Sequence, residues 1–463
     1  MQAVSDYIQN HRQAFADDLA ELLRIPSVSA DSRQNAETRR AADWVAAQFQ
    51  QLGLTSETIP TGGHALVYAE TPPVPGKPVV LVYGHYDVQP PEPLDEWITP
   101  PFEPTVRDGN LYARGATDDK GQMLTHVKGV EAWMKSVGKL PIQVKFLIEG
   151  EEEVGSEHIT PFVHQQRDKL ACDAVVISDC SQFAPGVPAI TYGLRGIAYY
   201  ELRLRGPKQD LHSGTFGGAI TNPANALVTL LAALKDKDGR IQVPGFYDDV
   251  LPLSDREREE YRSLPLTDDE FMQSVGVTSM FGEAGYSAIE RRWARPTCDI
   301  NGLTSGYQGE GAKTVLPAKA SAKFSFRLVP NQNPAKIAKS LRKFLEDRLP
   351  PGIQMELVDH HGAPGVVVSL ESPYMTAAAA AIESAFGTAP VFIREGGSIP
   401  IVNTFAEELG ADVLLLGWGQ NDDNTHSPNE KFSLDDYHRG TLASAQLWEE
   451  IAKLAPASTT KKN

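Results

Sequence analysis

Four apolar runs, each leading into histidine or carboxylate side chains, constrain the fold of this chain more than any other feature. They cover residues 79–83, 144–148, 174–177 and 413–416 and consist mainly of Val, Leu and Ile. Such runs are typical of strands that are covered on both faces, as in a parallel sheet. Because helical patterns alternate with them, the sequence predicts an α/β fold with a mainly parallel sheet and helices on both faces.

The pattern changes after Gly193. Segments 198–206 and 320–330 alternate between apolar and polar side chains, which is typical of antiparallel strands with one exposed face. The alternation of strands and helices returns near residue 369. We therefore expect two domains, namely a discontinuous α/β domain of residues 1–192 and 369–463 and an inserted α+β domain of residues 193–368.

Helical periodicity predicts amphipathic helices at residues 4–24, 37–52, 123–137, 222–234, 334–348, 372–387 and 433–454. The helix over 123–137 has Asp118 or Asp119 in place to cap its amino end. Two stretches lack a periodic pattern. Residues 91–112 are rich in proline and polar side chains and predict an irregular connection, whereas the charged stretch 235–295 is too long for a simple loop and its structure stays open.

Composition excludes several classes of protein. The formal net charge of -17 argues against a nucleic-acid or anionic-membrane partner, since both require concentrated Lys and Arg. Cys172, Cys180 and Cys298 suit neither a disulfide framework nor a thiolate zinc site, so any metal must be held by histidine and carboxylate. The amino terminus lacks the features of a signal peptide, and no apolar run approaches the ~18 residues of a membrane span. We expect a cytoplasmic enzyme.

Acidic and imidazole side chains gather at one predicted edge of the sheet. Each follows the carboxyl end of an apolar strand, except Asp118, which opens a helix at the same edge; the set is His85, Glu151 to Glu153, Asp179, His426 and Asp118. In a doubly wound sheet these ends line one crevice. Taken singly, Asp118 could cap a helix and Asp179 could serve a turn, but five positions at one edge favour a shared site.

Histidine and carboxylate together suit divalent metal ions. Two ions ~3.5 to 4 Å apart that share a bridging carboxylate can activate a water and polarise a carbonyl. Asp87 lies two residues beyond His85 and could accept the second N–H of that imidazole. A glutamate next to the ligands could take the proton of the attacking water. The predicted chemistry is hydrolysis of an amide.

The motifs GHYDVQP, GATDDKGQ, EGEEEVGSE, SDC, DLHSG, FSFRLVP, REGGSIP and THSPNEK occur in this order from residue 84 to 431. This ordered set resembles the di-zinc metallopeptidase family of carnosine-type dipeptidases, glutamate carboxypeptidase, acetylornithine deacetylase and succinyl-diaminopimelate desuccinylase. GHYDVQP, GGSIP, NEK and the long insertion are most similar to the dipeptidase branch. The resemblance implies cleavage of dipeptides or short peptides by a metal-bridging water.

The resemblance also implies roles for individual residues. It predicts two divalent metal ions per subunit, with zinc favoured over manganese or cobalt. His85 and Asp179 would bind one ion, and His426 and Glu153 would bind the other. Asp118 would bridge the two ions. Glu152 corresponds to the general base and Asp87 to the orienting carboxylate. The three consecutive glutamates leave a role for Glu151 open, and Cys180 could contact a metal, although filling the core is the favoured interpretation.

The inserted domain corresponds to the family's lid and dimerisation domain, which implies a homodimer. In the family, the histidine that corresponds to His212 reaches the neighbouring subunit's site and stabilises the oxyanion, while Arg327, Thr314 and Ser398 hold the substrate's terminal carboxylate. An arginine suits that carboxylate because it offers a bidentate fork. Arg327 could instead be an ordinary exposed strand residue, and Thr314 and Ser398 could only satisfy turns.

Two other functions stay open at this point. One is an amino-acid deacylase or carbamoylase that uses the same chemistry, which a comparison of dipeptides with N-acyl amino acids would separate. The other is a catalytically silent binding or scaffold protein that has kept the fold. The presence of every ligand position and of the base position argues against the silent protein.

Overall fold

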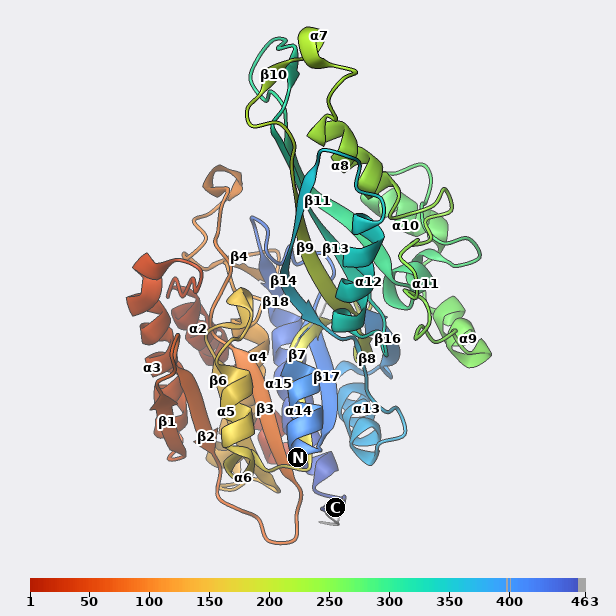
Figure 1. The fold of residues 1–463 in the computed structure, drawn as a ribbon. Helices are drawn as coiled ribbons and strands as arrows, with labels where there is room; N and C mark the ends of the chain where they lie inside the picture. Colours follow the sequence, from red (N-terminus) through yellow and green to blue (C-terminus); the bar gives the residue numbers. More distant parts are fainter. Residues whose placement is uncertain (397–398, 400, 457–463) are drawn as a thin grey trace. The chain divides into compact units, whose positions relative to one another are not determined.

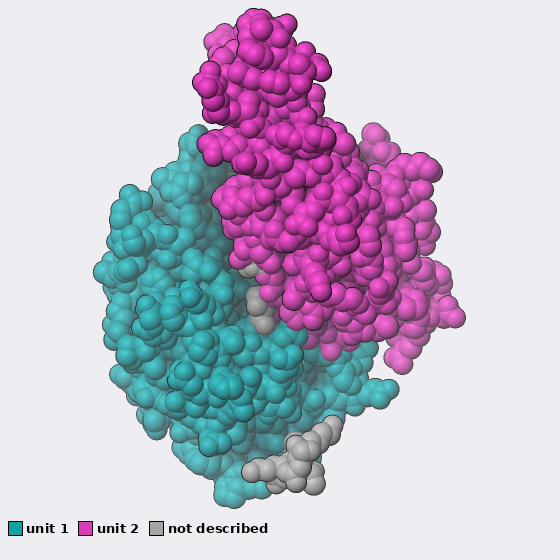
Figure 2. Space-filling model, in the orientation of Figure 1, with its two compact units in different colours: residues 1–192, 368–393, 401–463 teal, residues 193–367, 394–400 magenta. Residues whose placement is uncertain are grey.

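The computed structural model describes residues 1–396, 399 and 401–456 of the chain. It divides into two compact units, which Figure 2 shows in different colours. The first unit comprises Met1–Tyr192, Val368–Ile393 and Ile401–Asn463, and the second comprises Gly193–Val367 and Arg394–Pro400. Segment 394–400 thus belongs to the second unit, whereas the sequence pattern assigned it to the first domain.

The first unit is built on a mixed sheet with a parallel centre (Figure 1). Its strands are β1 (Thr55–Ile59), β2 (Leu66–Glu70), β3 (Val79–His85), β6 (Gln143–Glu149), β7 (Ala174–Ser181), β8 (Ala189–Leu194) and β17 (Asp412–Gly419). They run in the order β1-β2-β6-β3-β7-β17-β8. The four central strands, β6, β3, β7 and β17, are parallel, whereas β2 and β8 pair antiparallel with their neighbours. The predicted mainly parallel α/β sheet is confirmed.

Helices cover both faces of this sheet. They are α1 (Gln2–Asn10), α2 (Arg12–Leu23), α3 (Asn35–Gln51), α4 (Lys120–Ser136), α5 (Ile159–Gln165), α6 (Arg167–Leu170), α13 (Pro373–Phe386), α14 (Ile401–Leu409) and α15 (Leu434–Ile451). On β3, Val80 and Val82 join the main apolar core, to which α4 and α15 contribute, whereas Tyr83 packs on Phe405 of α14 with 5.5 Å between ring centroids. Because neighbouring strand residues face opposite ways, α4 and α14 cover opposite faces.

Two local predictions for this unit need correction. The helix expected over 4–24 is divided at His11, whose φ of -111° lies outside the helical range. The stretch 91–112 is not wholly irregular, because β4 (Thr105–Arg107) and β5 (Asn110–Tyr112) form a hairpin that pairs with β18 (Lys431–Ser433). Its turn holds Asp108 at φ 48° and Gly109 at φ 77°, which suits a tight hairpin turn.

The second unit contains a four-stranded antiparallel sheet in the order β11-β13-β9-β14 (Figure 1). The strands are β9 (Gly196–Arg205), β11 (Thr297–Ser305), β13 (Lys319–Leu328) and β14 (Gln354–Ala363). Helices α8 (Pro223–Ala232) and α12 (Pro334–Glu346) pack on one face, where alternate strand side chains form a second apolar core. Shorter elements are α7 (Ser213–Phe216), β10 (Leu211–His212), β12 (Val315–Leu316), β15 (Val366–Val367) and β16 (Val391–Glu395), the last of which spans both units.

The stretch that the pattern left open, 235–295, contains three short helices. They are α9 (Asp255–Ser263), α10 (Asp268–Val275) and α11 (Ala288–Trp293), and each begins with a capping box. In each box a Ser or Thr side chain accepts from the backbone N–H of a Glu three residues later, and that Glu side chain accepts in return. Local hydrogen bonding thus starts helices that are too short and polar to show clear periodicity.

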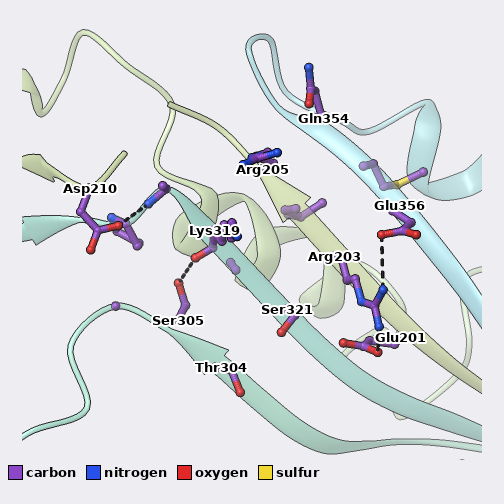
Figure 3. Close-up of a pocket in the computed structure, with 16 residues that line it drawn as sticks. Glu201, Arg203, Arg205, Asp210, Thr304, Ser305, Lys319, Ser321, Gln354 and Glu356 are labelled. Carbon is purple, nitrogen blue, oxygen red and sulfur yellow. Dashed lines mark hydrogen bonds and ion pairs between the residues drawn. The ribbon is translucent and has the colours of Figure 1, made fainter. Parts of the chain in front are cut away.

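The open face of the four-stranded sheet carries a broad hollow of about 750 Å³ (Figure 3). Charged side chains line it, and Arg203 there pairs with Glu201 at 2.8 Å and with Glu356 at 3.5 Å. None of the predicted metal ligands lies among its lining residues. No helix in the described part of the chain is long and apolar enough to cross a membrane.

Candidate metal centre

His85 is the last residue of β3 and is fully buried. Its Nδ1 lies 3.1 Å from the backbone carbonyl oxygen of Asp87 and 3.4 Å from Oδ1 of the same residue. Its Nε2 lies 3.2 Å from Asp118 Oδ1 and 3.9 Å from Asp179 Oδ2, yet it forms no hydrogen bond with any described residue. With its proton on Nδ1, the ring presents the Nε2 lone pair to a space between two carboxylates.

His426 stands across Asp118 from His85. Its Nε2 lies 2.9 Å from Asp118 Oδ2 and 3.3 Å from Glu153 Oε2. The backbone of His426 has a φ of 61°, which L residues other than Asn, Asp and His rarely adopt. The loop is tied down by Asn429, whose side chain accepts from Ile98 N at 2.9 Å and donates to Glu96 O at 2.8 Å. A strained backbone held in this way is typical of a functional site.

Asp118 therefore joins two groups of potential ligands, His85 with Asp179 and His426 with Glu153. Its two carboxylate oxygens face different histidines. Although burial alone would raise the pKa of Asp118, the neighbouring imidazoles of His426 and His85 hold that pKa below its usual range. The structure brings all five predicted ligands together at the carboxyl edge of the sheet.

The pKa shifts in this cluster show that its acidic side chains are crowded together. Burial and the charges of Asp118 and Asp119 raise the pKa of Asp179 well above its usual range, and burial together with Asp118 also raises that of Glu153. Hydrogen bonds with Asp118 and Glu153 raise the pKa of His426 to about 10. The carboxylates of Asp179, Glu153 and Asp118 thus repel one another in the buried cluster. The donor set of two imidazoles and three carboxylates fits two divalent cations, which would offset that repulsion.

The three consecutive glutamates differ in what they contact. Burial raises the pKa of Glu152 to about 8, with further effects from the charges of His85, Glu153 and Asp118, so this carboxyl lies within the cluster. Glu151 instead bonds the loop before β2, since its Oε1 accepts from His64 N at 3.1 Å and its Oε2 lies 2.8 Å from His158 Nδ1. Glu152 is therefore the glutamate suited to move a proton.

Asp87 links the two groups of ligands. It contacts the His85 ring, and its Oδ2 accepts a hydrogen bond from the backbone N–H of Glu153 at 3.2 Å. The expected contact between the His85 ring and the Asp87 carboxylate is present, but the backbone carbonyl lies closer. Cys180 is buried and belongs to neither ligand group formed by the described residues.

Three residues that contact the predicted ligands or the backbone beside them were not among the predicted site residues. Glu430 bonds the loop before α4, Gln89 Nε2 donates to Glu153 Oε2 at 2.7 Å, and Asp119 Oδ2 accepts from His85 N at 3.2 Å. Asp118 or Asp119 was expected to cap α4; Asp119 occupies the N-cap position, but its side chain forms no cap hydrogen bond. All three lie inside the quoted motifs, so their positions were visible, whereas their partners are distant in sequence.

Two predicted substrate-binding residues lie together in the second unit. His212 pairs with Val315 in the β10-β12 ribbon, and the backbone N–H of Ser213 donates to Thr314 O at 3.1 Å. His212 Nδ1 accepts from the backbone N–H of Gly214 at 3.1 Å. A neutral ring must then carry its proton on Nε2, which makes that nitrogen a hydrogen-bond donor.

Arg327 lies elsewhere in the same unit, on β13 between Thr297 of β11 and Ile197 of β9. Burial lowers the pKa of its guanidinium, and the charge of Asp299 acts in the opposite direction. Ser398, the fourth predicted substrate residue, lies outside the described residues.

Comparisons with known proteins agree with this geometry. The profile of peptidase family M20/M25/M40 matches residues 81–450. The chain is 35% identical to human Beta-Ala-His dipeptidase over 98% of this chain and 93% of that protein. It is 33% identical to the Cys-Gly metallodipeptidase dug1 of Schizosaccharomyces pombe, over 97% and 98% of the two chains.

Solved structures give the same result. The crystal structure of human carnosine dipeptidase 1 matches with a TM-score of 0.86 and 35% identity, covering 98% of this chain and 99% of that one. The M20 family metallo-carboxypeptidase Sso-CP2 of Sulfolobus solfataricus also reaches a TM-score of 0.86, at 32% identity over 95% and 99% of the two chains.

Proposed function

Because this chain belongs to peptidase family M20/M25/M40, we propose that it is a metal-dependent dipeptidase that hydrolyses the amide bond of dipeptides or similar short peptides. The observation that carries the proposal is the pair of ligand groups that share Asp118, with the Glu152 carboxyl beside them. Cys-Gly and β-Ala-His, which the names of the relatives mention, are the first substrates to test.

In this proposal each subunit binds two divalent ions. His85 and Asp179 hold one, His426 and Glu153 hold the other, and Asp118 contacts both. When bound, the ions lower the pKa of the attacking water and polarise the scissile carbonyl. Zinc suits imidazole and carboxylate ligands best, and manganese or cobalt are the alternatives.

Glu152 acts as the general base. A pKa near neutral lets a carboxyl take a proton from water and release it to the departing amine within one turnover. Burial supplies that pKa in the ion-free protein, and bound cations would lower it. Asp87 orients the His85 ring and, through the backbone N–H of Glu153, the second group of ligands.

The second unit supplies the substrate contacts in this proposal. Arg327, Thr314 and Ser398 hold the terminal carboxylate, and the Nε2 proton of His212 stabilises the oxyanion. We propose that His212 serves the site of a partner subunit and that the second unit is the lid and dimerisation domain of a homodimer. We also propose a cytoplasmic location, which the three free cysteines support.

Substrate panels with defined metals test the activity. Purified protein loaded with zinc, manganese or cobalt is incubated with Cys-Gly, β-Ala-His and a series of N-acyl amino acids. We expect hydrolysis of dipeptides and its loss after chelation. Activity on N-acyl amino acids alone would contradict the proposed substrate class, and absence of bound metal in every preparation would contradict the metal centre.

Mixing two inactive variants tests the role of His212 in a dimer. Subunits with Glu152→Ala are dissociated and reassociated with subunits that carry His212→Ala. If His212 acts across the dimer, half of the random dimers regain one intact site, and about a quarter of wild-type activity returns. If His212 acts within its own subunit, every site keeps one defect and no activity returns.

A further inference from the structure

The second unit contains a pocket of about 310 Å³ that arginine side chains line. Arg195, Arg291 and Arg292 contribute to its wall, together with Thr297, Asp299 and apolar side chains from residues 271–281. Asp299 is the only carboxylate residue among its described lining residues. The pocket differs from the hollow in Figure 3, in which arginine is paired with glutamate.

Arg195 is the residue between β8 and β9, and two nitrogen atoms of its side chain lack hydrogen-bond partners among the described residues. Its Nε and Nη1 atoms are buried and form no hydrogen bond with any described residue. Burying a guanidinium without hydrogen-bond acceptors is strongly destabilising, so such groups are normally paired. The two unsatisfied N–H groups are therefore available to an acceptor from outside the described residues.

Other positive groups surround Arg195. Arg327 neighbours Thr297 across the β13-β11 pair, and Thr297 lines the pocket. Burial, with the charges of Arg327 and Arg292, lowers the pKa of Arg195 to about 10, against the opposing charge of Asp299. Glu395 faces Arg292, and Arg291 Nε donates to the backbone carbonyl of Glu283 at 3.0 Å.

The Glu283 carboxylate does not neutralise the pocket. Its Oε2 pairs with Arg295 at 2.6 Å, whereas the hydrogen bond from Arg291 goes to the Glu283 backbone carbonyl. The arginines of the pocket and Arg327 therefore outnumber Asp299 and Glu395. An anion placed among these arginines would lower their mutual repulsion and satisfy the Arg195 N–H groups.

We propose that this pocket binds a compact oxyanion, with Arg195 as its main ligand, and that in the working enzyme the oxyanion is the side-chain carboxylate of an acidic dipeptide. Arg327 beside it is the arginine proposed to hold the terminal carboxylate, so the two arginines would bind the two carboxylates of one substrate. The link to substrate rests on the proposed dipeptidase function, whereas the oxyanion site itself does not.

Sulfate binding tests the site without requiring catalysis. Sulfate is used because it is a compact oxyanion and a weak ligand of divalent metals. Calorimetric titration of the metal-loaded protein at constant ionic strength should show sulfate binding that weakens at least tenfold in Arg195→Gln. The control Arg203→Gln removes the same charge from a paired arginine of the same sheet and should leave binding unchanged (Figure 3).

Kinetics then identify the source of the oxyanion. For Arg195→Gln, KM should rise at least tenfold for Gly-Glu, with little change for Gly-Gln, and sulfate should compete with Gly-Glu in the wild type. Sulfate binding without competition would assign the pocket to a free anion and overturn the substrate role. Arg195→Lys keeps one positive charge and should retain part of the binding, which separates a lost ligand from a misfolded variant.

Absence of sulfate binding to the wild type, or equal binding to wild type and Arg195→Gln, would overturn the site. The two proposals fail separately. A protein that binds sulfate through Arg195 but cleaves no dipeptide would contradict the proposed function and leave the oxyanion site standing. If the protein cleaves dipeptides but Arg195→Gln changes neither sulfate binding nor KM, the proposed function stands and the oxyanion site is contradicted.

Discussion

Glu430 accepts a hydrogen bond from the backbone N–H of Asp118 at 3.2 Å, across 312 residues of sequence. The same carboxylate accepts from the backbone N–H groups of Gly115 at 2.9 Å and Thr117 at 3.0 Å, and from Arg114 Nη1 at 2.7 Å. Glu430 is fully buried. The Glu430 side chain therefore fixes the backbone that carries Asp118, the proposed bridging carboxylate. Glu430 itself lies four residues after the proposed ligand His426.

Replacing Glu430 with Gln should weaken the metal centre without touching a ligand. The amide NH₂ would face N–H donors on one side, so the 115–118 loop would lose one of its two acceptor oxygens and Asp118 would shift. We expect metal affinity and kcat/KM to fall about 10- to 100-fold, as for other residues that orient ligands. Competition with a chelator measures the affinity, and the visible spectrum of the cobalt-loaded protein reports the changed ligand geometry.

The matched control is Glu450→Gln, which removes an exposed carboxylate that pairs with Lys453 at 2.6 Å. It should leave metal affinity and the cobalt spectrum unchanged, because exposed ion pairs contribute little. If Glu430→Gln lowers the melting temperature but keeps the wild-type cobalt spectrum and metal affinity, Glu430 is structural only.

Adjacent glutamates should give opposite results. Glu152→Gln should lower kcat about 10²- to 10⁴-fold with metal content unchanged, because it removes the proposed proton acceptor and no ligand. Glu151→Gln should keep kcat within a few-fold and lower stability, because it breaks the contacts with His64 and His158. Steady-state kinetics, metal analysis and thermal unfolding measure the three quantities. The reverse assignment would follow if Glu151→Gln lost kcat and Glu152→Gln kept it.

The tautomer of His212 predicts which substitution preserves its function. Since Nδ1 accepts from Gly214 N–H, the useful donor is Nε2, whose position a Gln amide reproduces better than an Asn amide. His212→Asn and His212→Ala should lower kcat about 10²- to 10³-fold, as for loss of an oxyanion donor, and His212→Gln should lose less. Metal affinity should be equal in all three variants. Equal kcat for the Gln and Ala variants would exclude a donor role.

The sequence predicted those elements of the fold that have a continuous apolar run or a clear helical periodicity. The strands β3, β6, β7 and β17 were predicted from continuous apolar runs, and the amphipathic α15 was predicted from helical periodicity. The capping boxes at Ser254, Thr267 and Ser287 match the pattern S/T-x-x-E in the sequence. The helices that follow them were not predicted, because they are too short to show a clear periodicity. The Asp108-Gly109 turn was a similar local signal.

Long-range contacts were beyond any pattern. The direction of Glu151 toward His64 and the bonds from Glu430 to the 115–118 loop depend on how distant segments pack. The same holds for Asp119, which has the spacing of a helix cap but bonds His85 N instead. The proposed ligand positions and the orienting residue Asp87 were predictable because they belong to an ordered set of motifs, whereas the contacts of Glu430, Gln89 and Asp119 are known only from the fold.

His126 on α4 is fully buried and contacts two serine side chains. Its Nδ1 lies 2.6 Å from Ser444 Oγ and its Nε2 lies 2.7 Å from Ser178 Oγ, next to the proposed ligand Asp179. Both contacts are neutral hydroxyls, and burial lowers the pKa of His126 to about 3. The folded protein therefore keeps this ring uncharged at pH values where the unfolded chain protonates it.

The consequence is a pH dependence of stability that one substitution should remove. Between pH 3 and about 6.5, the pKa of an unfolded histidine, the unfolded state binds one more proton at His126 than the folded state does. The contribution of His126 to the free energy of unfolding is therefore complete above about pH 6.5. Below that pH it falls by up to about 1.4 kcal/mol per pH unit. In urea unfolding from pH 5 to 8, the difference between wild type and His126→Gln should shrink as the pH falls, because Gln cannot titrate. His438, whose pKa burial lowers to about 4, acts in the same direction in both proteins and cancels from the difference. A constant difference between the two proteins from pH 5 to 8 would mean that His126 is protonated to the same extent in the folded and unfolded states, contrary to its burial between two hydroxyls.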